Sequence, residues 1–285
     1  MDADPLLTTL LDLDLALPNI ELSIGGGYGL FLKQQHLAKS EQIRTLLPLS
    51  AMPFARTTED IDWILRADIV TDSSQMGMIR RALDTLGFRV VETAKYTQFV
   101  RKLAIGSVKI DLLAAPLREF AQRVPRDTRR VKPRPSVKLH ASKLEEALAV
   151  EQGALRVTIS GKLSSGDEHS ALIQIPQTFS YLLMKLIAFD DRRSDEDKDF
   201  GRHHALDIYR IVAMLTKDED SSVRRLFSEY SSHEVTQRAR QIAMTDFVDR
   251  DGIGLLRIQE HQLYSQNMEL KRFVQELKAL FDGSA

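Results

Sequence analysis

Alternating apolar and polar positions predict strands in the first part of the chain, and apolar positions three and four apart predict helices in the last part. A period of two is typical of a half-buried strand, whereas a period of 3.6 is typical of an amphipathic helix. The predicted strands are Ile20–Ile24, Arg56–Leu65, Phe88–Val91, Gln98–Leu103, Val108–Leu113, Leu155–Ser160 and Ala171–Ile175. The predicted helices are Pro5–Leu17, one beginning at Tyr28, one capped by Ser73 or Ser74 and ending at Gly87, Leu144–Val150, and several after Gln177, the last from about Gln262 to Phe281.

This order of elements predicts an α/β (α+β) fold in two parts. Residues 1–176 are expected to form a mixed sheet flanked by helices. Residues 177–285 are expected to form a helical C-terminal domain, because no alternating run interrupts their helical periodicity.

The stretch Arg56–Leu65 places two acids inside an apolar frame. Residues i and i+2 of a strand point to the same face, so Asp60 and Asp62 are expected to project side by side while Ile61 faces the core. Two close carboxylates repel each other, and a divalent cation removes that repulsion. An isolated Asp-x-Asp also occurs often on exposed strand faces and in loops, so the motif needs a third acid to be informative.

Asp111 supplies that third acid. In the predicted strand Val108–Leu113, Val108, Ile110 and Leu112 share one face, and Lys109 and Asp111 share the other. Neighbouring strands lie ~5 Å apart, so the three acids converge if this strand pairs with the Asp60 strand. The alternative is a single exposed Asp on an edge strand.

A glycine run, Gly25-Gly26-Gly27, stands between the first predicted strand and the helix that begins at Tyr28. Glycine lets a backbone approach a ligand closely, and the first amides of a helix attract anions. The sequence therefore predicts either a phosphate-binding turn or a simple tight turn at this position.

Composition narrows the function only slightly. The chain has 285 residues, of which 43% are hydrophobic, and its 39 basic and 40 acidic residues give a net charge of −1. No global charge favours nucleic acid or a membrane. Cysteine is absent, and we find neither a signal peptide nor an apolar run that could cross a bilayer, so we expect a cytoplasmic protein without a membrane partner.

Charge is instead concentrated in the segment between Arg118 and Lys138. Its basic residues are Arg118, Arg123, Arg126, Arg129, Arg130, Lys132, Arg134 and Lys138. Such a run forms either a solvated connector or a polyanion contact. By contrast, we expect Asp195–Asp199 to be a solvated acidic loop and His203 to be a hydrogen-bonded structural residue.

Two groups of residues resemble the AbiEii-type nucleotidyltransferases, toxins of type IV toxin–antitoxin pairs within the superfamily of DNA polymerase β type. Ile24–Gly27 followed by Arg56-Thr57-Thr58-Glu59-Asp60-Ile61-Asp62 is similar to the family's glycine and R-x-T-x-D-I-D segments. Lys185–Ala188, then Arg192 or Arg193, then Arg202–Tyr209 are similar to its K-L-x-A…R…D-x-x-D-L segment. Gly26-Gly27 stands where many members have Gly-Ser, and His204 where they carry an acid.

The resemblance implies a catalytic domain in residues 1–176 that transfers NMP from an NTP, such as ATP or GTP, to an acceptor hydroxyl. It implies that Asp60, Asp62 and Asp111 bind Mg²⁺ or Mn²⁺ and carry the catalysis. It also implies a nucleotide-binding set consisting of Gly25, Gly26, Gly27, Thr58, Lys185, Arg192 and Asp207. The acceptor would be RNA, including tRNA, or a protein, and an antitoxin protein would be a partner.

Two other functions remain open at this point. One is an enzyme that nucleotidylates a small molecule of the antibiotic type, which needs an open acidic acceptor pocket. The other is an inactive nucleotidyltransferase-like module that only binds a partner, against which the presence of all three acids argues.

Overall fold

The computed structural model describes residues 4–40, 42–53, 58–103, 106–127 and 129–282. It divides into two compact units, each made of several chain segments. Unit 1 comprises residues 1–29, 57–145 and 154–176, and unit 2 comprises residues 30–56, 146–153 and 177–285. The division into domains at residue 176 stays a prediction. Within the described residues, no helix is both long and apolar enough to cross a membrane.

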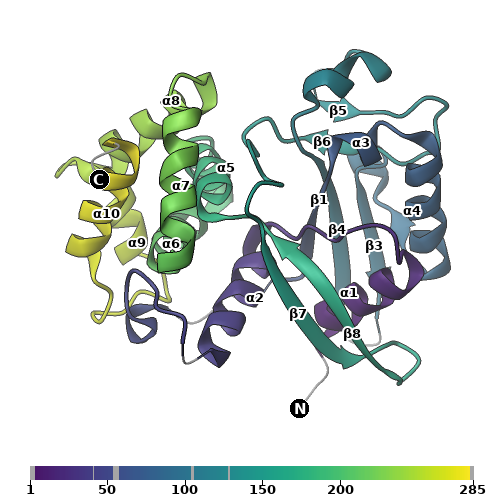
Figure 1. Ribbon diagram of the computed structural model, residues 1–285, viewed down its shortest axis with the longest axis horizontal. Coiled ribbons are helices and arrows are strands. Elements are labelled where there is room, and N and C mark those ends of the chain that lie inside the picture. Colours follow the sequence, from purple (N-terminus) through teal and green to yellow (C-terminus); the bar gives the residue numbers. More distant parts are fainter. Residues whose placement is uncertain (1–3, 41, 54–57, 104–105, 128, 283–285) are drawn as a thin grey trace. The chain divides into compact units, whose positions relative to one another are not determined.

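Unit 1 is built on a mixed sheet whose central strand is β4 (Figure 1). On one side β4 pairs in parallel with β1, and on the other it pairs antiparallel with β3 and, at its end, parallel with β6. β2 extends the sheet beyond β3, and β5 extends it beyond β6. The strands are β1 (Asp60–Leu65), β2 (Arg89–Val90), β3 (Gln98–Lys102), β4 (Ser107–Ala114), β5 (Arg130–Val131) and β6 (Ala141–Lys143).

The burial of β4 alternates along its whole length. Val108, Ile110 and Leu112 are fully buried, whereas Lys109 and Asp111 are half-buried. One face of β4 therefore belongs to the core, and the other presents polar side chains at the centre of the sheet. The predicted strand parity is confirmed here.

Helices and a hairpin complete unit 1. The hairpin strands β7 (Leu155–Lys162) and β8 (Glu168–Ile175) pair antiparallel, and α1 (Pro5–Ala16) packs on them. Gly161 allows this packing, because a Cβ there would lie 3.2 Å from the Leu7 side chain. The remaining helices are α3 (Ala67–Val70) and α4 (Ser73–Thr85). Asp72, rather than Ser73 or Ser74, caps α4, because its carboxylate accepts the backbone N–H groups of Ser74 and Gln75.

The prediction of a strand at Ile20–Ile24 is wrong. Only isolated bridges form there, from Ser23 to Gln174 and from Ile24 to Trp63. The segment alternates in polarity, but it connects the edge of β1 to β8 through single bridges and does not run along either strand. It leads into α2 (Gly26–Lys39), which begins at Gly26 and not at Tyr28.

The chain after Gln177 is helical, as predicted. Unit 2 contains α2 from Leu30 onward, and its later α-helices are α5 (Thr178–Asp190), α6 (Arg202–Ala213), α7 (Lys217–Glu229), α8 (Glu234–Ile242), α9 (Ile253–Gln259) and α10 (Leu270–Asp282). The central pair is α5 with α6, and α8 packs on α5 while α9 packs on α6 (Figure 1).

Two helix predictions in this region are wrong. The last helix, α10, begins at Leu270 and not at about Gln262. Residues 261–269 form turns and bends, and the backbone N–H of Leu263 donates to Nδ1 of His261. Leu144–Val150 also forms turns, and Ala149 has a left-handed φ of 54° that interrupts a helix.

Candidate functional site

Four charged residues form a square on one face of the sheet in unit 1. The parallel pairing of β1 with β4 places Asp62 opposite Asp111 and Asp60 opposite Lys109. Because residues i and i+2 share a face, all four side chains project from the same side of these two strands. The predicted pairing of the two acidic strands is therefore present. We call Asp60, Asp62, Lys109 and Asp111 the acidic square.

Lys109 lies among the carboxylates. Its Nζ is 3.2 Å from Oδ1 of Asp60 and 3.7 Å from Oδ2 of Asp111. The exposed fractions of the side chains are 45% for Asp60, 31% for Lys109 and 19% for Asp111, so the square deepens toward Asp111. Its formal charge is negative, because one ammonium faces three carboxylates.

Asp111 is the most perturbed acid of the square. Burial raises its pKa to about 6, the Lys109 ammonium opposes this rise, and the negative charges of Asp62 and Asp60 add to it. Its Oδ1 is buried and has no hydrogen-bond partner among the described residues. A buried carboxylate oxygen without a partner is costly, and a cation would satisfy it.

The glycine turn lies directly against this square. The N–H of Gly25 donates to the backbone carbonyl of Asp62 at 2.8 Å, so this amide already has a partner within the protein. Gly26 has a left-handed φ of +61°, and a Cβ there would lie 1.7 Å from Oδ2 of Asp62. No residue with a side chain fits at Gly26 while Asp62 keeps its place. Gly26 and Gly27 are the first two residues of α2.

Thr58 has a local structural contact. Its hydroxyl accepts the backbone N–H of Asp60 at 3.3 Å and fixes the start of β1. Arg56 and Thr57, which precede it in the R-x-T-x-D-I-D segment, lie outside the described residues. A contact between Thr58 and a nucleotide stays a prediction.

The remaining predicted nucleotide-binding residues belong to unit 2. Lys185 Nζ is 2.8 Å from Oδ2 of Asp207, and Arg210 reaches Oδ1 of the same carboxylate at 3.3 Å. All three side chains are at most 9% exposed. Arg192 donates to the carbonyl of Ala188 at 3.0 Å, near the end of α5. The structure thus unites Lys185 with Asp207, and the role of all three residues toward a nucleotide stays a prediction.

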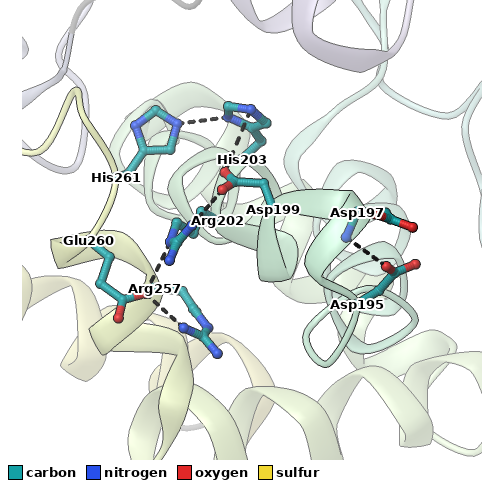
Figure 2. Close-up of polar contacts among 8 residues, drawn as sticks. All are labelled: Asp195, Asp197, Asp199, Arg202, His203, Arg257, Glu260 and His261. Carbon is teal, nitrogen blue, oxygen red and sulfur yellow. Dashed lines mark hydrogen bonds and ion pairs between the residues drawn. The ribbon is translucent and has the colours of Figure 1, made fainter.

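The acidic loop and His203 form a second polar cluster in unit 2 (Figure 2). Arg202 binds Asp199 and Glu260, and Arg257 also binds Glu260. The N–H of Leu263 donates to Nδ1 of His261, so in the neutral ring the proton of His261 sits on Nε2 and is donated to Nδ1 of His203, 2.8 Å away. The two rings therefore satisfy each other, and they do not point two lone pairs at a common cation.

Among the described residues, no group of three or more His, Cys, Asp or Glu side chains is arranged as a ready metal cluster. Lys109 explains this for the acidic square, because its ammonium stands where a cation would meet Asp60 and Asp111. The donors nevertheless fit a hard divalent ion. They are carboxylate oxygens, they carry excess negative charge, and Asp111 offers a buried oxygen without a partner.

Lys109 is the residue of this site that motif analysis missed. The sequence does place Lys109 on the same strand face as Asp111, but only the register of β4 against β1 shows that it also faces Asp60. The signal in the sequence was the position of Lys109 two residues before Asp111, which places both side chains on one face of the strand.

No family model and no curated protein matches this chain. Among solved structures, it is similar to the solution structure of the antibiotic-resistance factor ANT(2'')-Ia, with a TM-score of 0.35 and 13% sequence identity. The similarity covers 80% of this chain and 96% of that chain. A similarity this distant assigns no function, which has to come from the acidic square itself.

Proposed function

We propose that this protein is a metal-dependent phosphoryl-group transferase, and more particularly a nucleotidyltransferase that moves NMP from an NTP to an acceptor hydroxyl. The observation that supports the proposal is the acidic square. Two acids on β1 and one on β4 lie side by side in a parallel ladder, and the glycine turn that opens α2 contacts the Asp62 carboxylate.

In this function Asp60, Asp62 and Asp111 would hold Mg²⁺ or Mn²⁺, which supplies charge that stabilises the attacking and leaving oxygens. Asp111 would also help to accept the proton of the acceptor hydroxyl, because its carboxylate is less exposed than that of Asp60 and has a buried oxygen without a partner among the described residues. The hydroxyl oxygen forms a bond to the α-phosphorus, the bond from that phosphorus to the β-bridging oxygen breaks, and pyrophosphate leaves. The protein contributes mainly position and charge.

The nucleotide itself would be bound by backbone and cationic groups. Gly26 would let the backbone approach a phosphate closely, and the amide of Gly27 at the start of α2 suits a phosphate oxygen. Gly25 would shape the turn, and Thr58 would position Asp60. Lys185, Arg192 and Asp207 are proposed to bind the nucleotide as well, as the resemblance to AbiEii-type enzymes implies.

For the acceptor, we propose RNA, in the manner of a toxin or a phage-defence enzyme with an antitoxin partner. The supporting observation is the basic segment. Its exposed cations are Arg118, Arg123, Arg126, Arg129, Arg134 and Lys138. The segment is partly folded, with a 3₁₀ helix at Arg118–Arg123 and with β5 paired to β6, which itself pairs with the end of β4. The part of the basic segment that forms β5 therefore lies in the same sheet as β4, the strand that carries Asp111.

The direct test incubates the purified protein and Mg²⁺ with each α-³²P-labelled NTP in turn, together with total RNA, a protein extract or a panel of aminoglycosides. Label transferred to RNA supports the full proposal. Label found only on protein or only on a small molecule corrects the acceptor, and no transfer with any NTP overturns the proposed enzyme.

The matched variants are Asp62→Asn and Asp68→Asn. Asp68 lies three residues beyond β1 in α3, is 38% exposed and pairs with Arg66, so it carries the same chemical change outside the square. We expect Asp62→Asn to lower transfer on the order of a thousandfold, since a metal contributes several kcal/mol to such a transition state. Asp68→Asn should transfer at the wild-type rate. Equal rates in both variants would remove Asp62 from the mechanism.

A further inference from the structure

Lys109 is fixed at its backbone, and its ammonium lies where solvent reaches it. Its N–H donates to the carbonyl of Glu59 at 3.0 Å, so the β1–β4 ladder fixes the position of its Cα. Its side chain is 31% exposed, and it faces Asp60, whose side chain is 45% exposed. The ammonium can therefore leave its carboxylate partners while the strand stays in place.

The Lys109 ammonium offsets a repulsion between carboxylates of the acidic square. Asp62 and Asp111 are direct cross-strand neighbours of like charge, which is an unfavourable pairing in a sheet. Lys109 lies diagonally opposite Asp62 and contacts the other two acids. Its ammonium is the cation that offsets this repulsion among the described residues of the square.

We propose that the Lys109 ammonium is a resident counter-ion of the acidic square, which a divalent cation displaces and which then binds a phosphate oxygen of the nucleotide. This inference rests on the proposed function. A divalent ion and an ammonium compete for the same oxygens of Asp60 and Asp111, and the ion carries twice the charge. Once displaced, a flexible, compact point charge fixed beside the site is suited to a phosphate.

This arrangement couples the two ligands. The metal has to displace Lys109 when it binds alone, and the phosphate provides the displaced ammonium with a new partner. Each ligand therefore favours the binding of the other by the same factor, as linkage requires.

The first experiment measures Mn²⁺ affinity by counting free Mn²⁺ with electron paramagnetic resonance, without nucleotide. Lys109→Met should bind Mn²⁺ about fivefold more tightly than the wild type, because the competing ammonium and its partly exposed ion pairs are gone. Lys102→Met is the matched control, since Lys102 is an exposed lysine at the end of β3. It should bind Mn²⁺ as the wild type does.

The second measurement uses the Mn²⁺-saturated protein and calorimetry with the α,β-methylene analogue of whichever NTP supports transfer. Lys109→Met should bind this analogue about fivefold more weakly than the wild type, and Lys102→Met should be unchanged. Loss of a purely structural lysine would not raise the affinity for Mn²⁺ while lowering the affinity for the nucleotide analogue. Unchanged affinities for both ligands in Lys109→Met would overturn the inference.

A third measurement compares melting temperatures in chelator and in saturating Mn²⁺. In chelator, Lys109→Met should melt about 2 °C below the wild type, because three carboxylates lose their counter-ion. Mn²⁺ should reverse this order. A variant that melts below the wild type by the same amount in both buffers would indicate an ordinary structural lysine.

Failure of the proposed function has a different signature. Asp62→Asn and Asp111→Asn would then bind Mn²⁺ with wild-type affinity, which would show that the square is not the metal site. If these variants lose Mn²⁺ while Lys109→Met binds it with unaltered affinity, the metal site stands and only the counter-ion inference falls.

Discussion

Two charged clusters of this protein solve the same electrostatic problem in opposite ways. In unit 2, the Asp207 carboxylate is shared between Lys185 and Arg210, and each of these side chains is at most 9% exposed. In unit 1, the acidic square sets three carboxylates against Lys109, is half exposed, and leaves an oxygen of Asp111 without a partner among the described residues.

The two clusters differ in how completely their charges are balanced within the chain. A buried cluster has to pair its charges within the chain, because no solvent can do so. The acidic square keeps an excess of negative charge and an open side, which makes it less favourable for folding and better suited to a cation. Removal of the carboxylate from the first cluster should therefore reduce stability, whereas removal of a carboxylate from the acidic square should reduce cation binding and leave stability unchanged or raised.

Removal of the shared carboxylate in unit 2 should have the largest effect on folding. Asp207→Ala leaves Lys185 and Arg210 as buried cations, and we expect it to lower the free energy of unfolding by about 3–5 kcal/mol. Urea denaturation measures this change. Lys185→Met is the control and should cost clearly less, because the Arg210–Asp207 pair remains; equal losses in both variants would show that Asp207 is not the centre of the cluster.

Gly26→Ala tests how closely the glycine turn approaches the acidic square. We expect it to cost about 2 kcal/mol in urea denaturation, from left-handed backbone strain and from the clash with Asp62. Gly87→Ala is the control, since Gly87 has a φ of +79° but nothing within 4 Å of an added Cβ. Gly87→Ala should lose stability through backbone strain alone and should bind Mn²⁺ as the wild type does. If both variants lost the same amount of stability and of Mn²⁺ affinity, a close approach at Gly26 would be contradicted.

The pKa of Asp111 predicts a pH-dependent stability in the absence of metal. Burial raises this pKa from 3.8 to about 6, so the folded state favours the protonated acid. Its favourable contribution is complete below pH 3.8 and is lost as the pH rises through about 6. Asn cannot ionise, and Asp111→Asn should therefore be more stable than the wild type above pH 6, by about 1 kcal/mol after allowance for solvent screening.

Melting curves in chelator across this pH range measure the effect. Asp84→Asn, on the exposed side of α4, supplies the control and should follow the wild type. A stability difference for Asp111→Asn that does not change with pH would contradict the raised pKa.

The smallest effect concerns the acceptor. Arg129→Glu combined with Arg130→Glu should raise the apparent KM for an RNA acceptor about threefold at low salt and less at high salt, with NTP dependence unchanged. Initial rates at two salt concentrations measure both. Arg225→Glu, on α7 in unit 2, is the control for a charge reversal elsewhere. A double variant with wild-type acceptor kinetics would withdraw the support that the basic segment gives to RNA.

Strand parity in the sequence was sufficient to predict the core of the candidate site. The alternation around Asp60, Asp62 and Asp111 gave the correct faces, and it placed the ends of β4 within one residue. The predicted acidic strand Arg56–Leu65 was too long at its start, because β1 begins at Asp60. The partner of each side chain depends on register, which is a tertiary property. The contact between Lys109 and Asp60 therefore could not be predicted from the sequence, because it depends on the register of β4 against β1.

The mistaken elements have the same cause. Ile20–Ile24 alternates like a strand, but the chain around it offers only single bridges to Trp63 and Gln174. Leu144–Val150 has helical spacing, yet it lies between a strand and a left-handed Ala149 and forms turns. Local periodicity indicates which side of a segment is buried, whereas tertiary contacts determine its backbone conformation.

The parallel ladder between β1 and β4 also makes the acidic square robust to changes in the length of the chain between them. That intervening chain contains α3, α4 and the β2–β3 hairpin. Residues can be added at its turn around Gly87, where an added Cβ would have nothing within 4 Å, without shifting the residue pairs of the ladder. A one-residue deletion inside either strand would instead turn every later side chain to the opposite face and send an acid into the core. We therefore expect the acidic square to survive insertions between the two strands and to be lost on a one-residue insertion or deletion inside either strand.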